Sequence, residues 1–185
     1  MSQVLREEAI ELVKKHVKKE NNIKHMLAVG AVMRGLALRL GEDEGKWEVT
    51  GILHDIDFEA CSGLGDHTLV ASRILEGLVE DDVIQAIKAH NYENTGVMPD
   101  SKFKKALIAS DAVSGLVVAA ALVMPSKKLK DVTVETLMKK YKSKDFAKGA
   151  DRGRIASCAE IGIPVEEFLG IALESMQKIA GEIGL

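Results

Sequence analysis

The stretch "GILHDIDFEACSGLGDH", Gly51 to His67, places the adjacent pair His54–Asp55 directly after an apolar run. A helix that only had to pack could have ended on a leucine and a glycine. Here two potential ligand side chains stand side by side at an apolar boundary, and another histidine follows a glycine-rich loop. This arrangement favours a binding or catalytic role for the segment over packing alone.

Apolar residues recur at helical spacing on both sides of this stretch, and no segment shows the sustained alternation of a strand. Asn21 or Asn22 is expected to cap the second helix, and Gly41 to end it. The predicted fold class is all-α, with loops over residues 57–66 and 91–100. The expected helices cover about residues 3–19, 23–40, 42–54, 67–79, 81–90, 101–124, 133–142 and 151–160, and a last helix begins near Pro164.

The composition limits the class of protein. A chain of 185 residues with 46% hydrophobic residues can bury the core of one domain. Its net charge of −3 gives no case for binding extended nucleic acid. Cys61 and Cys158 do not form a disulfide framework, and no apolar run approaches the ~20 residues of a membrane span. We therefore expect a cytoplasmic protein without a membrane partner.

One segment departs from the acidic character of the rest. Between Lys127 and Arg154 there are ten Lys or Arg residues against four Asp or Glu residues. The segment is either a solvated helical hairpin that aids solubility, or a positive surface that leans over a binding pocket and draws in an anion. The sequence leaves both interpretations open.

Four of the five histidines, His25, His54, His67 and His90, fall at predicted helix ends, while His16 fits a solvated helix face. Asp111 lies inside the apolar run "ALIASDAVSGLVVAAAL", where a carboxylate is costly unless it is neutralised. A buried Lys or Arg, a neighbouring helix end or a bound cation could each compensate it. Taken together, imidazole and carboxylate groups with few sulfurs describe a divalent metal site.

These residues, in this order, resemble the HD superfamily of metal-dependent phosphohydrolases, whose pattern is H…HD…D. "GILHDID" looks like the family's HDIG variant, and "GDHTLVASRIL" and "AIKAHN" match the extra histidines of members that hold two metals. The resemblance implies a single HD-type helical bundle over residues 1–185. Its metal-binding core would cover about 23–120, and additional C-terminal helices about 126–185.

The resemblance also implies a ligand set and a reaction. The first metal would be held by His25, His54, Asp55 and Asp111, and Asp55 would bridge to a second metal completed by His67 and His90. One or two divalent ions (Mn, Fe, Co, Ni, Zn or Mg) would activate water to cleave a phosphomonoester or phosphodiester, with a nucleotide as the expected substrate. The alternatives are a metal-retaining binding module with little catalysis and a di-iron oxygenase on the same ligands. The oligomeric state is left open.

Other polar residues near the motif are candidates for supporting roles. Asp57, Glu59 and Asp66 could act in acid–base catalysis, orient an imidazole, or simply be loop acids. The chain departs from the family pattern at two places: Asp57 and Phe58 follow "HDI" where Gly and Lys are common, and Asn91 stands where some members have a histidine. Possible substrate contacts are Asn91, Arg73, Lys88, Lys104 and Lys105.

Overall fold

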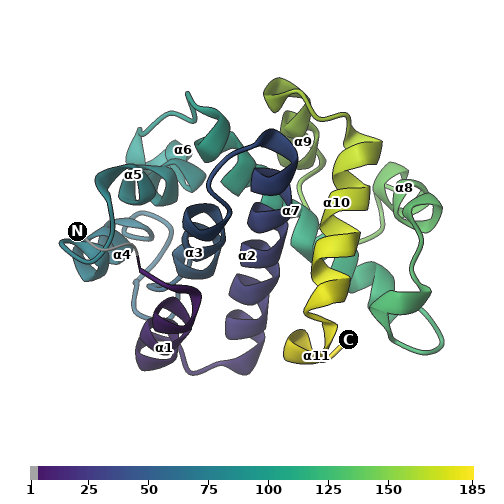
Figure 1. The fold of residues 1–185 in the computed structure, drawn as a ribbon, viewed down its shortest axis with the longest axis horizontal. Coiled ribbons are helices and arrows are strands. Elements are labelled where there is room, and N and C mark those ends of the chain that lie inside the picture. Colours follow the sequence, from purple (N-terminus) through teal and green to yellow (C-terminus); the bar gives the residue numbers. More distant parts are fainter. Residues whose placement is uncertain (1–3) are drawn as a thin grey trace.

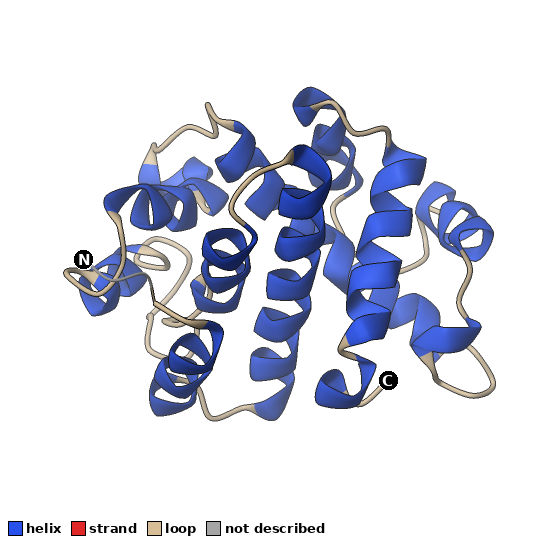
Figure 2. Cartoon of the chain, viewed as in Figure 1, coloured by secondary structure: helices blue, strands red, loops and turns tan. Residues whose placement is uncertain are grey.

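The computed structural model describes residues 4–185, and all the regular elements within that range are helices, which confirms the all-α prediction (Figure 2). Two short 3₁₀ helices, Leu129–Asp131 and Ser157–Ile161, join the longer ones. The α-helices are α1 (Arg6–His16), α2 (Glu20–Leu40), α3 (Glu44–Leu53), α4 (Leu69–Leu75), α5 (Asp81–His90), α6 (Tyr92–Thr95), α7 (Lys102–Leu122), α8 (Val134–Lys142), α9 (Arg152–Ala156), α10 (Val165–Lys178) and α11 (Ala180–Ile183).

Helix α2 lies at the centre of the molecule and packs against α3, α7 and α10 (Figure 1). Helices α4, α5 and α6 lie on the α3 side, and α8 lies on the α10 side (Figure 1). One cluster of buried apolar side chains runs through both sides, from Val13 in α1 to Phe168 in α10. The C-terminal helices therefore share a core with the helices that carry the HD motif.

The α2–α3 pair is the closest helix contact near the motif, and glycine makes it possible. A Cβ atom on Gly51 would stand 2.7 Å from the Cα of Gly30, and a Cβ on Gly30 would stand 2.6 Å from the side chain of Ile52. The two backbones touch at this point because neither glycine has a side chain. This contact fixes the distance between His25 on α2 and His54 at the end of α3.

Helix α7 is the one described helix that is long and apolar enough to cross a membrane. It packs against α2, α3, α5, α8, α9 and α10, and most of its apolar side chains are buried. Its apolar composition is therefore that of a core helix. Asp111 lies halfway along it.

The predicted cap of α2 was wrong. The helix begins at Glu20, and Asn21 and Asn22 lie inside its first turn. The backbone N–H groups of Lys18 and Lys19 donate instead to the Glu59 carboxylate, which also accepts from the Asn22 side chain. A residue about forty positions away in sequence thus holds the chain just before α2, whose N-cap residue, Lys19, makes no side-chain capping bond. Two smaller differences are that the loop 91–100 contains α6, and that the helix expected over 151–160 divides into α9 and a 3₁₀ turn.

Candidate metal centre

Six side chains from five segments of the chain converge at one point, where α2, α3, α5 and α7 meet. His54 is fully buried, and His67 and His90 are nearly so, while His25 is partly open to solvent. Three overlapping groups within this set have ligand atoms that all lie within 4.8 Å of one another. The six residues are His25, His54, Asp55, His67, His90 and Asp111, which we call the His–Asp cluster.

Each imidazole of the cluster has its Nδ1 atom bound on the side away from the centre. Nδ1 of His54 donates to the Gly51 carbonyl at 2.7 Å, and Nδ1 of His90 donates to the Ile87 carbonyl at 2.7 Å. Nδ1 of His67 donates to Asp57 at 2.9 Å. In α2, His25 Nδ1 lies 3.3 Å from the Ser114 hydroxyl, which itself donates to the Asp111 carbonyl. All four rings are thereby fixed in the tautomer whose Nε2 carries a lone pair.

The four Nε2 atoms point to one another and to the two carboxylates. Nε2 of His67 and Nε2 of His90 are 3.2 Å apart, and Nε2 of His54 is buried without a hydrogen-bond partner. The neutral rings offer only acceptors at the centre, because each has its proton on Nδ1. Acceptor atoms packed this closely repel one another unless a cation or a proton lies between them.

The raised pKa values of His54 and His67 also show that positive charge is stabilised at the centre of the cluster. Burial alone would lower the pKa of His54, but the carboxylates of Asp55 and Asp111 outweigh it and raise the pKa to about 9. Burial likewise opposes charge on His67, yet Asp55 and Asp57 raise its pKa to about 10. Without a metal, protons would collect on these rings.

The two oxygens of Asp55 divide the cluster into halves. Oδ2 lies 3.7 Å from His25 Nε2 and 3.4 Å from His54 Nε2, and Oδ1 lies 3.2 Å from His67 Nε2 and 3.4 Å from His90 Nε2. Two ligands on one cation at ~2.1 Å stand ~3.0 Å apart in octahedral and ~3.4 Å apart in tetrahedral coordination. Three of these four separations fall in or at the edge of this range and the fourth, 3.7 Å, lies above it, so the atoms on each oxygen of Asp55 are near the spacing of ligands on one cation. Asp111 Oδ1, 3.2 Å from His25 Nε2, gives the first half a fourth donor.

This geometry agrees with a comparison with known families. Residues 22–116, more than half of the chain, match the HD domain. The chain belongs to the HD domain family. Its members are generally metal-dependent phosphohydrolases. No curated protein and no solved structure matches this HD domain.

Two cavities that share Asp111 and Arg154 open onto the cluster of this HD domain, and a third, of about 450 Å³, reaches His25 alone and is also lined by Lys24. One, of about 530 Å³, lies on the His25 side and is also lined by Gly149, Ala150 and Asp151 from the end of the basic segment. The other, of about 450 Å³, lies on the His67 and His90 side and is also lined by Phe58, Leu64 and Asn94. Asp111 and Arg154 line both cavities. Solvent and small ligands therefore reach the cluster from more than one direction.

Asp57 supports the cluster without facing either cavity. Its fully buried carboxylate accepts from His67 Nδ1 and from the backbone N–H groups of Thr68 and Ala71. Thr68 has a positive φ of 71°, which is costly for a β-branched residue, and the carboxylate holds it there. Of the roles expected for Asp57, orienting an imidazole fits these contacts, and acid–base catalysis does not.

The other acids expected near the site have different tasks. Glu59 holds the backbone of Lys18 and Lys19 just before α2, as described above, and lines neither cavity. Asp66 accepts from the backbone of Ser62 and Gly63 and from the Ser62 hydroxyl, so it closes its own loop, and its pKa is lowered to about 2. The described contacts of Glu59 are therefore with the first turn of α2 and the segment that leads into it, and its catalytic role stays a prediction.

The expected substrate contacts divide in the same way. Asn91 lines the His67 cavity, but its amide donates to the carbonyls of Leu64 and His67, so it braces the loop that carries His67. Lys104 pairs with Asp100, and Lys105 pairs with Glu160. Arg73 is exposed on α4 and Lys88 is half-buried on α5. None of these four cations is among the described residues that line the two cavities.

Sequence reasoning missed two residues near the cluster. Ser114, one turn after Asp111, holds the His25 ring. Arg154 stands between the cavities, and its only sequence signal was its place at the end of the basic segment. The other Lys and Arg residues of that segment line neither cavity. The guanidinium of Arg152 donates to six backbone carbonyls of residues 140–150, so it holds the loop that forms the cavity wall.

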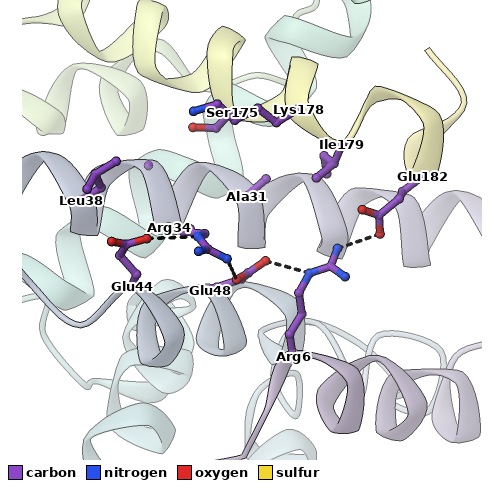
Figure 3. A pocket seen from close by; sticks show the side chains of 11 residues that line it. Arg6, Ala31, Arg34, Leu38, Glu44, Glu48, Ser175, Lys178, Ile179 and Glu182 are labelled. Carbon is purple, nitrogen blue, oxygen red and sulfur yellow. Dashed lines mark hydrogen bonds and ion pairs between the residues drawn. The ribbon is translucent and has the colours of Figure 1, made fainter.

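A further cavity, of about 430 Å³, lies at the other end of the α2–α3 pair (Figure 3). We call it the Arg6 cavity. Arg6 reaches Glu48 and Glu182, and Arg34 reaches Glu44 and Glu48. Glu48 is the buried member, and both of its oxygens are engaged by the arginines. The arginines and carboxylates of this cavity thus satisfy one another.

Proposed function

We propose that this protein is a metal-dependent phosphohydrolase that cleaves a phosphomonoester or phosphodiester, with a nucleotide as the favoured substrate. The observation that carries the proposal is the acceptor-only centre of the His–Asp cluster. The four imidazoles are held with their Nε2 lone pairs facing two carboxylates, and the contacts that hold them lie outside the centre. Such a set of side chains is stable around cations and poorly suited to anything else.

The donor set favours some metals over others. Four imidazole nitrogens with two carboxylates suit Mn, Fe, Co, Ni or Zn better than Mg, which prefers oxygen ligands. The half with His25, His54, Asp111 and Asp55 Oδ2 offers four donors, and the half with His67, His90 and Asp55 Oδ1 offers three. We therefore propose tighter binding in the first half.

When bound, a divalent cation would supply Lewis acidity and lower the pKa of a coordinated water toward neutrality. The protein itself contributes position and exclusion of bulk water. Asp57 keeps the His67 ring in place, and Gly51 keeps the His54 ring in place. Phe58 and Leu64, both half or more exposed, give the His67 cavity an apolar wall against which a nucleobase could lie.

One observation favours the second candidate, a binding module with little catalysis. The acids Asp57, Glu59 and Asp66 are engaged in holding backbone or imidazole groups. None of these three is free to protonate a leaving group. A slow enzyme, or one limited to substrates with good leaving groups, would follow.

The deciding experiment begins with elemental analysis of the purified protein. The metal is then removed with a chelator, and the protein is reloaded with Mn²⁺ and assayed on 4-nitrophenyl phosphate, bis(4-nitrophenyl) phosphate and a nucleotide panel. We expect turnover that requires metal and disappears in His54→Ala. Metal and nucleotide binding without turnover would establish the binding module. Dioxygen uptake by the iron-loaded protein without hydrolysis would establish the oxygenase.

A further inference from the structure

Arg154 enters the site from outside the matched HD region. It belongs to α9, nearly forty residues beyond position 116, where the family match ends. Arg154 and Asp111 are the two residues that line both cavities next to the cluster. The guanidinium therefore stands at the boundary between the His25 side and the His67 side, where a molecule bound at the cluster from either cavity would meet it.

The side chain of Arg154 is held in place before any ligand arrives. Nη1 donates to the His90 carbonyl at 3.2 Å, and Nη2 donates to Glu93 at 2.8 Å. The guanidinium carbon also lies 5.9 Å from the centre of the Tyr92 ring. These two bonds engage two of the five N–H donors that an arginine offers, and among the described residues the remaining donors have no partner. An anchored guanidinium with free donors is prepared to bind oxyanions.

Lys24 lines the third cavity beside His25 and pairs with Glu20, and it does not border the two cavities that Arg154 joins. Among the described residues that line the two cavities, Arg154 is the one Lys or Arg, and the carboxylates of Asp55, Glu93, Asp111 and Asp151 line them as well. The motif itself supplies no cation, since Asp57 and Phe58 follow "HDI". A bound cation would offset part of this negative charge, and Arg154 adds the one fixed positive side chain among the described residues at the two cavities.

We propose that Arg154 binds the phosphoryl oxygens of the substrate and holds the phosphate against the His–Asp cluster. Glu93 is a positioning residue that keeps Nη2 of the guanidinium turned toward the cavities. This inference rests on the proposed function for the presence of a phosphorylated substrate. It adds that the C-terminal extension, and not the HD motif, supplies the phosphate contact.

The experiment uses the metal-loaded full chain with inorganic phosphate as the probe. The Kd of phosphate is measured by calorimetry, and the KM and kcat of the protein are measured on 4-nitrophenyl phosphate. For Arg154→Ala we expect phosphate affinity to fall about tenfold or more and KM to rise, because a charge-assisted hydrogen bond is lost. Arg154→Lys should recover only part of the affinity, since an ammonium cannot present a planar fork. Metal stoichiometry should stay at the parent value.

Arg39→Ala is the matched control, because Arg39 also pairs with a glutamate, Glu167, but lines neither cavity. It should leave Kd and KM unchanged. If Arg154→Ala unfolds, the phosphate Kd and the KM of Arg154→Lys at full metal occupancy are compared with those of the parent instead. Parent-like phosphate affinity in the folded Arg154 variants overturns the inference while metal-dependent turnover still supports the proposed function. If instead the parent binds phosphate through Arg154 but shows no turnover, the inference about Arg154 is supported and the proposed function is overturned.

Discussion

The Arg6 cavity and the His–Asp cluster lie at opposite ends of the same helix pair. At one end Arg34 of α2 meets Glu48 of α3, and at the other His25 of α2 faces His54 with the ring centres 5.2 Å apart. Both ends bury charged or ionisable side chains. In the Arg6 cavity the arginines donate to the glutamates, so the donors and acceptors are matched. At the centre of the His–Asp cluster the acceptors have no matching donors: Nε2 of His54 has no hydrogen-bond partner, and Nε2 of His67 faces Nε2 of His90.

This difference separates a structural polar network from a ligand site. A network that satisfies itself gains nothing from a ligand, and any ligand must first break its internal bonds. In the His–Asp cluster the N–H groups of the imidazoles all point outward, so the acceptor atoms at the centre have no hydrogen-bond donor within the cluster. A bound cation, or an added proton, would satisfy them. Cavity size does not make this distinction, because the Arg6 cavity and the two cavities at the cluster have similar volumes.

Removing a ligand of the cluster should have the largest effect. Asp55→Ala or His54→Ala should eliminate bound metal and turnover together. It should also remove the stabilisation that metal gives the fold, about 2.7 kcal/mol when free metal is about 100 times its Kd. Elemental analysis and thermal unfolding in metal-replete buffer measure both effects. His16→Ala is the control, since His16 is exposed on α1. A ligand variant with parent metal content and melting temperature would refute the site.

Spreading the helix pair should disturb both ends at once. In Gly51→Ala the new Cβ would meet the backbone of Gly30 at 2.7 Å, so the helices must separate. We expect a loss of about 3 kcal/mol in the free energy of unfolding, at the upper end of overpacking costs, and weaker metal binding. Gly115→Ala is the matched control, because a Cβ there meets open space in helix α7. It should stabilise the fold by about 0.5–1 kcal/mol. Equal melting temperatures for the two variants would contradict the contact.

Breaking the self-satisfied end should cost stability alone. Glu48→Gln leaves Arg6 and Arg34 without their shared anion, and we expect a loss of about 1–3 kcal/mol. This is less than for a fully buried pair, because both arginines are partly exposed. Metal content and turnover should match the parent. Chemical denaturation and elemental analysis are the measurements, and loss of metal at unchanged stability would reverse the assignment of the two ends.

The smallest effect is expected from charges that belong to neither cluster. Lysines on and just after α8 line neither cavity, and Lys139 pairs with Glu135. Neutralising the four together should reduce kcat/KM at low salt only slightly, by much less than the ~10-fold that charges lining a cleft contribute to association. It should also flatten the dependence of kcat/KM on salt. Metal binding should not change. An unaltered salt profile would show that they are only a soluble surface. The four are Lys139, Lys140, Lys142 and Lys144.

Local patterns predicted the parts of this molecule that depend on local contacts. The helices around the motif were expected within a few residues of their observed ends, because apolar spacing and Gly41 are local signals. The family pattern identified the six cluster residues. The partners of Glu59 and Asp57 could not be read from the sequence, because the fold brings the segments before α2 and before α4 to these two side chains. Arg154 could not be ranked above its neighbours, since only the packing of α9 on α7 brings it to Asp111.

The buried charges near the cluster have a consequence for how its ligands cooperate. Asp55, Asp57 and Asp111 stand against one guanidinium, that of Arg154, whose charge interacts with Asp111. Glu93, which pairs with the same guanidinium, adds a fourth carboxylate, so one bound divalent cation would leave the group negative and a second would make it positive. The second cation and the phosphate should therefore raise each other's affinity by the same factor, as thermodynamic linkage requires. If the proposed function holds, metal titrations without phosphate would underestimate the occupancy of the second half during turnover, because the substrate would itself help to load it.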